Sequence, residues 1–100
     1  MIIVNGRLEL SEAHIAALKL AMASMEDASR EEEGCFDYTF SVEVNEPGII
    51  RITERWESMA ALHVHFASTH MAEFQGAMSE HPPTNAEVHF YEVERELPRP

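Results

Sequence analysis

The sequence predicts an α+β domain with a ferredoxin-like βαββαβ order, in which helices cover one face of an antiparallel sheet. Three observations support this. Apolar residues alternate in four segments, they recur at helical spacing in others, and a Pro-Gly pair separates the two middle strands. The 100 residues are enough for one domain, 1–100, with residues 98–100 as a frayed tail. Right-handed crossovers make this order the simplest way to close the sheet.

The first part of the chain predicts a strand followed by a long helix. The strand covers residues 2–10, where apolar residues alternate. Ser11 is a good N-cap, and the helix extends to about residue 32. Gly34 then suits a helix C-terminus because glycine tolerates positive φ. The apolar face of this helix contains Ile15, Leu18, Met22 and Met25.

The rest of the chain predicts three strands and two short helices. Pro47 and Gly48 favour a turn over residues 45–48, so the middle strands form a hairpin. The helical region is expected to break near Ser68. Pro82-Pro83 forces an extended connection to the last strand. The predicted strands are 35–44, 49–57 and 86–97, and the predicted helices are 58–66 and 69–79.

Apolar side chains on both faces of the predicted sheet favour a homodimer. The last strand carries Val88 and Phe90 on one side and Tyr91, Val93 and Leu97 on the other. An exposed aromatic face on a small protein usually marks an interface, so two sheet backs are expected to meet. The alternative is a different register, since a slip of one residue exchanges the faces. The second strand would group Phe36, Tyr38, Phe40, Val42 and Val44.

Composition excludes several classes of function. Eighteen acidic and seven basic residues give a net charge of −11, with one lysine. Nucleic acid and anionic membranes both attract clustered Lys and Arg, so neither is an expected partner. No apolar run approaches the roughly 20 residues that cross a bilayer, and the N-terminus does not resemble a secretory signal. The single cysteine, Cys35, fits a reducing cytoplasm.

Residues 54–74 concentrate the groups that are suited to catalysis. If Trp56 faces the core, alternation sends Glu54 the same way, and a buried carboxylate needs a partner. His65 or His70 could pair with Glu54 and act as a general base toward a phenol or enol. The alternative is a purely structural buried pair. His65 and His70 would diverge on one continuous helix, but a break near Ser68 could turn both inward.

No metal or cofactor is predicted from the sequence. The spacing of the histidines is poor for metal ligation, and there is no His-Glu-x-x-His pattern or second ligand cluster. The four glycines form neither a dinucleotide fingerprint nor a phosphate-binding loop. His63 is expected to be exposed, because it diverges from His65 within a helix.

Several apolar side chains could line a pocket for a flat aromatic ligand. Trp56 is the strongest of these candidates, and Asn5 and Tyr38 are candidate hydrogen-bond donors. The alternative for each apolar residue is ordinary core packing. The other candidate lining residues are Phe66, Phe74 and Met78.

The chain resembles the antibiotic biosynthesis monooxygenase family of dimeric α/β-barrel proteins. The segments that carry the resemblance are Ser29-Arg30-Glu31-Glu32-Glu33-Gly34-Cys35, Tyr38, Glu54-Arg55-Trp56-Glu57-Ser58, Ala61-Leu62, His65, Ser68, His70 and Phe74. This resemblance implies a ferredoxin-like fold, a dimer, and a pocket between sheet and helices in each subunit.

The resemblance also implies a range of activities. Members include oxygenases that convert aromatic polyketide anthrones to quinones with molecular oxygen and without metal or flavin. They also include haem-degrading enzymes and enzymes that act on quinols or small signalling molecules. The expected function is a cofactor-independent monooxygenase for a small aromatic, polyketide or quinol-type compound, with His65 or His70 as base. The alternatives are a non-catalytic dimeric binding protein and a haem-degrading relative, although His65 and Gln75 replace the Trp and the iron-ligating His of that group.

Overall fold

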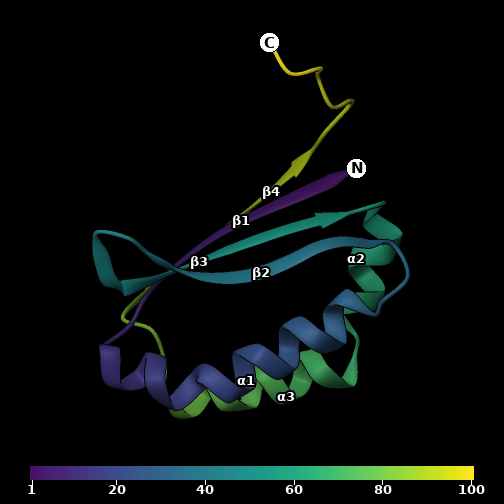
Figure 1. The fold of residues 1–100 in the computed structure, drawn as a ribbon. Coiled ribbons are helices and arrows are strands. Elements are labelled where there is room, and N and C mark those ends of the chain that lie inside the picture. Colours follow the sequence, from purple (N-terminus) through teal and green to yellow (C-terminus); the bar gives the residue numbers. More distant parts are fainter.

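The computed structural model describes residues 1–100 and contains one four-stranded antiparallel sheet with the strand order β2-β3-β1-β4. All three helices lie on one side of this sheet (Figure 1). The predicted ferredoxin-like α+β fold is therefore confirmed. The elements are β1 (Ile2–Glu9), α1 (Glu12–Arg30), β2 (Cys35–Glu43), β3 (Glu46–Trp56), α2 (Met59–Phe66), α3 (Thr69–Glu80) and β4 (Asn85–Glu92).

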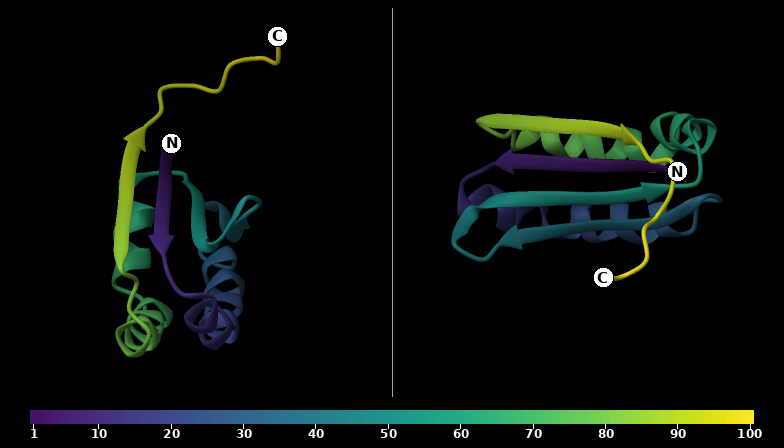
Figure 2. Two further views of the ribbon diagram at one scale, coloured as in Figure 1. Left: turned by 90° about the vertical axis from the view of Figure 1, so that its left-hand side faces the viewer. Right: turned by 90° about the horizontal axis from the view of Figure 1, so that it is seen from above.

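The core fills the space between the sheet and the helices. α1 and α3 run side by side beneath the sheet, and α2 lies at the end of the sheet near the N-terminus (Figures 1 and 2). Two buried clusters result. The first contains Ile2, Val4, Met25, Tyr38, Trp56, Leu62 and Met71, and the second contains Leu8, Leu10, Leu18, Met22 and Ile50. No helix is both long enough and apolar enough to cross a membrane.

Serine caps define where the helices begin. Ser11, Ser58 and Ser68 are the N-caps of α1, α2 and α3, and each side-chain oxygen accepts the backbone N–H three residues further on. These hydrogen bonds satisfy donors that would otherwise have no partner at a helix start. The predicted break near Ser68 is confirmed, because α2 ends at Phe66 and α3 begins at Thr69.

A bulge in β2 changes which side chains face the core. Cys35 pairs with Trp56 and Asp37 pairs with Arg55, so Phe36 is an extra residue in the ladder. The predicted grouping of Phe36 with Tyr38 is therefore wrong. Tyr38 is buried, whereas Phe36 is 55% exposed.

The hairpin turn is shorter than predicted. It consists of Val44-Asn45 rather than residues 45–48, and β3 already begins at Glu46. Gly48 has a different role, because its carbonyl accepts the backbone N–H of Leu10 at 2.8 Å. A Cβ at Gly48 would lie 2.8 Å from the Leu10 carbonyl oxygen. Glycine is needed here because another backbone segment approaches closely.

The last strand also ends earlier than predicted. β4 stops at Glu92, which pairs with Ile2 at the start of β1. The backbone N–H of Val93 still reaches the carbonyl of Met1, at 2.8 Å. Beyond that point β1 offers no further partner, so Leu97 is not in a strand as expected. The segment after Glu92 extends away from the domain (Figure 1).

The face of the sheet that points away from the helices is open. Strand pairing places Val88 and Phe90 opposite Gly6 and Val4, on the helix side. Tyr91, which is 51% exposed, is on the open face. That face is mainly polar rather than aromatic, unlike the expected dimer surface. Its polar side chains include Asn5, Arg7, Arg51, Thr53, Arg55 and His89.

Candidate functional site

Three side chains from separate segments meet at one carboxylate oxygen. His65 Nδ1 lies 2.6 Å from Glu32 Oε2, and His70 Nε2 lies 3.0 Å from the same oxygen. The two imidazole rings are 5.8 Å apart between centroids. His65 is fully buried, while the side chains of Glu32 and His70 are 14% and 23% exposed. This cluster connects the core with the surface.

The break between α2 and α3 brings the two histidines together. His65 is on the buried side of α2, and His70 is in the first turn of α3. Ser68 Oγ donates to the His65 carbonyl at 2.6 Å while it accepts from the Met71 N–H. The chain direction therefore changes at a defined place. Residues five apart on one helix would point to different faces, and the break removes that restriction.

Glu32 lies in the turn between α1 and β2. Gly34 in this turn has φ +84°, a conformation that favours glycine. The Gly34 carbonyl accepts the Glu57 N–H at 2.7 Å, which holds the turn beside the start of α2. Sequence reasoning did not single out Glu32, which is the middle one of three consecutive glutamates. The β2–β3 register could have identified it. Because Cys35 lies opposite Trp56, the turn that contains Glu32 lies at the end of β3, next to the start of α2.

Glu54 does not pair with either histidine. Its Oε1 accepts the Trp56 indole N–H at 2.8 Å, and Glu32 takes the place beside His65 and His70. The predicted Glu54–His pair is therefore wrong. Glu54 and Trp56 are two residues apart on one strand and share its inner face, so the indole N–H can reach the carboxylate.

Burial shifts the acidities of several groups around this corner. Burial raises the pKa of Glu54 to about 7, although the Trp56 hydrogen bond opposes the shift. Burial also raises the pKa of the Tyr38 phenol far above its usual value and that of the Cys35 thiol to about 11. The pKa of His65 is lowered by burial, which outweighs its hydrogen bond to Glu32. Tyr38, Cys35 and His65 are consequently neutral at neutral pH.

The hydrogen bonds define which ring nitrogens carry hydrogen. An ionised carboxylate can only accept, so His65 Nδ1 and His70 Nε2 both donate to Glu32. In neutral rings the remaining nitrogens, His65 Nε2 and His70 Nδ1, carry lone pairs. His65 Nε2 is buried without a hydrogen-bond partner. His70 is the more accessible of the two rings and therefore the one that can exchange a proton with a ligand.

The shifted acidity of Glu54 predicts a specific pH dependence of stability. A pKa raised from 4.5 to about 7 means that the folded state binds more protons than the unfolded state between these values. The unfolding free energy should therefore fall as pH rises through that window, by roughly 3 kcal/mol for a full shift of this size. Glu54→Gln stays neutral and still offers an oxygen to Trp56. Its stability relative to wild type should increase by roughly 2–3 kcal/mol from pH 5 to pH 8.

Urea unfolding at a series of pH values measures this difference. Other titrating groups cancel, because they are common to both proteins. Glu57→Gln is the matched control, since it removes the same charge from an exposed position. A stability difference between Glu54→Gln and wild type that stays constant with pH would contradict the buried-carboxylate interpretation.

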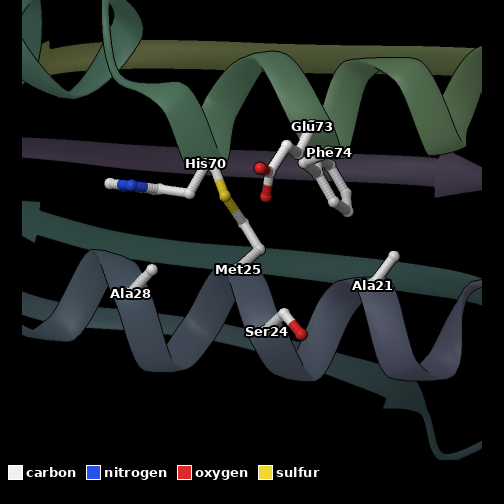
Figure 3. A pocket seen from close by; sticks show the side chains of 7 residues that line it. All are labelled: Ala21, Ser24, Met25, Ala28, His70, Glu73 and Phe74. Carbon is white, nitrogen blue, oxygen red and sulfur yellow. The ribbon is translucent and has the colours of Figure 1, made fainter.

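A cavity of about 300 Å³ lies between α1 and α3 and reaches the histidine cluster through His70 (Figure 3). The His70 ring extends toward the Ala28 end of the cavity, whereas Glu73 and Phe74 line its other part. Four of the seven lining residues are apolar, while Ser24, His70 and Glu73 are polar, which suits a small ligand with an apolar body and a polar group. The lining residues are Ala21, Ser24, Met25, Ala28, His70, Glu73 and Phe74.

The structure brings only some of the predicted ligand-binding residues to this corner. The Trp56 ring lies 4.6 Å from the His65 ring, and the Tyr38 ring lies 5.2 Å from it, between centroids. Trp56 is completely buried and packs behind the cluster instead of lining the cavity. Phe74 does line the cavity, as Figure 3 shows. Tyr38 and Trp56 therefore support the histidine cluster from the core side.

Three predicted residues do not line the cavity. Asn5 is on the open face of the sheet, because its neighbour Val4 faces the helices. Phe66 is 46% exposed, and its ring packs against His65 and Phe90, with centroid distances of 5.7 Å and 6.1 Å. Met78 packs against the second buried cluster, away from His65. His63 is exposed, as predicted.

Comparisons with known proteins agree with this architecture. Residues 1–77 match the family model of the antibiotic biosynthesis monooxygenases. A Deinococcus radiodurans crystal structure, provisionally assigned as such a monooxygenase, is 29% identical, with a TM-score of 0.91 and coverage of 99% of this chain and 98% of that one. A conserved Methanosarcina mazei Go1 protein is 25% identical, with a TM-score of 0.86 and coverage of 93% and 92%.

Other comparisons support the fold alone or give no match. A Mycobacterium tuberculosis protein shares the fold at 23% identity, with a TM-score of 0.84 and coverage of 95% and 96%. Among curated proteins, none matches the sequence. The family match covers more than three quarters of the chain and includes Glu32, His65 and His70. The chain therefore belongs to the antibiotic biosynthesis monooxygenase family.

Proposed function

We propose that this protein is a cofactor-independent monooxygenase for a small, electron-rich aromatic compound. The observation that carries the proposal is the Glu32–His70 pair at the wall of a partly apolar cavity. A carboxylate that holds one imidazole nitrogen leaves the other nitrogen free as a general base. Family membership supports oxygenation as the reaction that follows proton removal.

In the proposed mechanism His70 starts the reaction by taking a proton. An anthrone illustrates the chemistry, since its ring methylene is acidic. The Nδ1 lone pair of His70 accepts a methylene proton, and the Glu32 carboxylate stabilises the resulting imidazolium. His65, buried and bonded to the same oxygen, keeps the carboxylate in position. Glu54 acts indirectly, by fixing the indole of Trp56 behind His65.

The oxygenation itself needs only substrate and molecular oxygen. The carbanion transfers one electron to O₂, and the two radicals combine to form a peroxide at the same carbon. The imidazolium returns its proton to the peroxide. Water is then eliminated, which removes the second methylene hydrogen and leaves a carbonyl at that carbon. The balance is anthrone plus O₂ giving quinone plus water. The apolar walls that include Met25 and Phe74 would keep bulk water away from the carbanion.

Oxygen uptake with a panel of anthrones and hydroquinones tests this proposal. We expect saturable uptake that depends on native protein and yields one quinone per O₂ with an anthrone substrate. Rates equal to those with heat-denatured protein would overturn the catalytic proposal. The cavity also favours a second function, namely binding of a small apolar ligand without catalysis. In that case the fluorescence of Trp56, the single tryptophan, would change saturably without oxygen uptake.

We also propose that two copies associate through the open face of the sheet. A 100-residue chain buries a modest core, and a second copy would cover the face that no helix covers. Light scattering after size-exclusion chromatography should give twice the chain mass of 11.3 kDa. Thr53→Arg, in the middle of the open face, should give the monomer. Leu20→Arg, on the 82% exposed surface of α1, should remain dimeric, and a monomeric wild type would disprove the association.

A further inference from the structure

We infer that Glu32, His65 and His70 form a binding site for one divalent transition-metal ion of the Zn²⁺ type. Their potential ligand atoms all lie within 4.8 Å of one another. The ligands come from the turn after α1, from α2 and from α3. In the sequence, the spacing of the histidines and the lack of a second ligand cluster predicted no metal site. The break at Ser68 brings the two histidines together, and Glu32 supplies the third ligand.

The separations between these atoms suit a shared ion. Zinc binds His nitrogen and carboxylate oxygen at about 2.0–2.2 Å, so neighbouring ligand atoms around one ion lie roughly 3 Å apart. The Glu32 oxygen is 2.6 Å from His65 Nδ1 and 3.0 Å from His70 Nε2. Small movements of the side chains would therefore admit an ion between the three atoms.

The donor set defines the class of ion. Two imidazole nitrogens and one carboxylate oxygen suit Zn²⁺, Fe²⁺ or Co²⁺, whereas Mg²⁺ and Ca²⁺ prefer oxygen ligands alone. Three protein ligands also leave at least one coordination position open. His70 lines the cavity, so that position is accessible to a small molecule.

The surroundings hold the ligands in place before an ion arrives. His65 is fully buried against the rings of Trp56 and Tyr38. Side chains fixed by packing lose little freedom on binding, which favours affinity. The net charge of −11 also attracts cations to the molecule.

Binding requires both histidines to change tautomer. The hydrogen on His65 Nδ1 moves to Nε2, and the hydrogen on His70 Nε2 moves to Nδ1, because the ion takes the freed lone pairs. The proposed catalytic base is the Nδ1 lone pair of His70, so a bound ion removes it. Zn²⁺ should therefore inhibit oxygen uptake. The binding itself does not depend on the proposed function, and it can be measured without a substrate.

Titration of metal-free protein with Zn²⁺ and Co²⁺ tests the site. Calorimetry should show one Zn²⁺ per chain, and Co²⁺ should give visible d–d absorption bands. Glu32→Gln and His70→Gln should each raise the Kd at least tenfold, since losing a ligand weakens binding at least as much as losing a supporting residue. Gln at position 70 can still donate a hydrogen bond to Glu32, so circular dichroism should confirm that this variant folds.

Matched controls separate this site from surface binding. Glu33→Gln removes the same charge from the exposed neighbouring residue, and His63→Ala removes an exposed histidine from α2. The rings of His14 and His81 lie 5.3 Å apart and are the other place where two imidazoles meet near the surface. Glu33→Gln, His63→Ala and His81→Ala should keep the wild-type Kd within about twofold. Binding that is lost in His81→Ala, kept in His70→Gln, or absent at millimolar Zn²⁺ would overturn the inference.

Discussion

His70→Ala is expected to slow protein-dependent oxygen uptake by roughly 10²-fold or more, because general-base catalysis typically contributes 10²–10⁴-fold. His70 is the one histidine that both contacts Glu32 and lines the cavity. The loss should appear in kcat more than in KM, since the ring takes the proton in the transition state. Stopped-flow or electrode measurements over a range of anthrone concentrations up to saturation would give both constants.

His63→Ala provides the matched control for this variant. His63 is an exposed histidine on α2 that makes no contact with Glu32, so its loss should leave kcat within about twofold. Glu32→Gln tests whether Glu32 acts as a positioning residue for the base His70. It should reduce kcat while His70 remains present, because the imidazolium loses its counter-charge. A His70→Ala variant that retains at least one third of the wild-type kcat would exclude His70 as the base.

Trp56→Ala is expected to reduce the unfolding free energy by roughly 3–5 kcal/mol, the range for removing a large buried aromatic side chain. Trp56 is completely buried and packs against His65 in the first core cluster. Its loss also leaves the Glu54 carboxylate without the indole donor. Urea unfolding followed by circular dichroism measures the change, since the variant lacks tryptophan fluorescence.

Trp56→Phe separates packing from hydrogen bonding. Phenylalanine retains most of the buried ring but removes the N–H that Glu54 accepts, so a loss of roughly 1–3 kcal/mol is expected. When Trp56→Phe is made together with Glu54→Gln, the pH dependence of the stability loss should differ from that of Trp56→Phe alone, because the titrating carboxylate is absent. A loss below 1 kcal/mol for Trp56→Ala would contradict the central packing role of the indole.

Local signals were sufficient to predict the order of the elements. The Ser11 cap predicts the start of α1, and the break expected near Ser68 coincides with the N-cap of α3. Alternation in β3 correctly predicted that Glu54 and Trp56 share the inner face. Periodicity and helix caps depend on residues only a few positions apart, so both can be recognised from the sequence alone.

The contacts that make the site depend on distant parts of the chain. Glu32 and His65 are 33 residues apart, and their contact requires the β2–β3 register and the position of α2 together. The bulge at Phe36 follows from cross-strand pairing, and the role of Gly48 follows from its contact with Leu10. None of these produces a local pattern. Glu54 was therefore assigned to the histidines because it was the nearest buried carboxylate in the sequence.

Nitrogen-15 NMR of the histidine side chains in metal-free protein tests the shared carboxylate most directly. His65 should show a protected hydrogen on Nδ1 with a strongly downfield proton shift, as expected for a short hydrogen bond to Glu32. Glu32→Gln should weaken that signal, and Glu33→Gln should preserve it. A His65 ring that exchanges with water and averages its tautomers as an exposed histidine does would show that the three side chains do not converge.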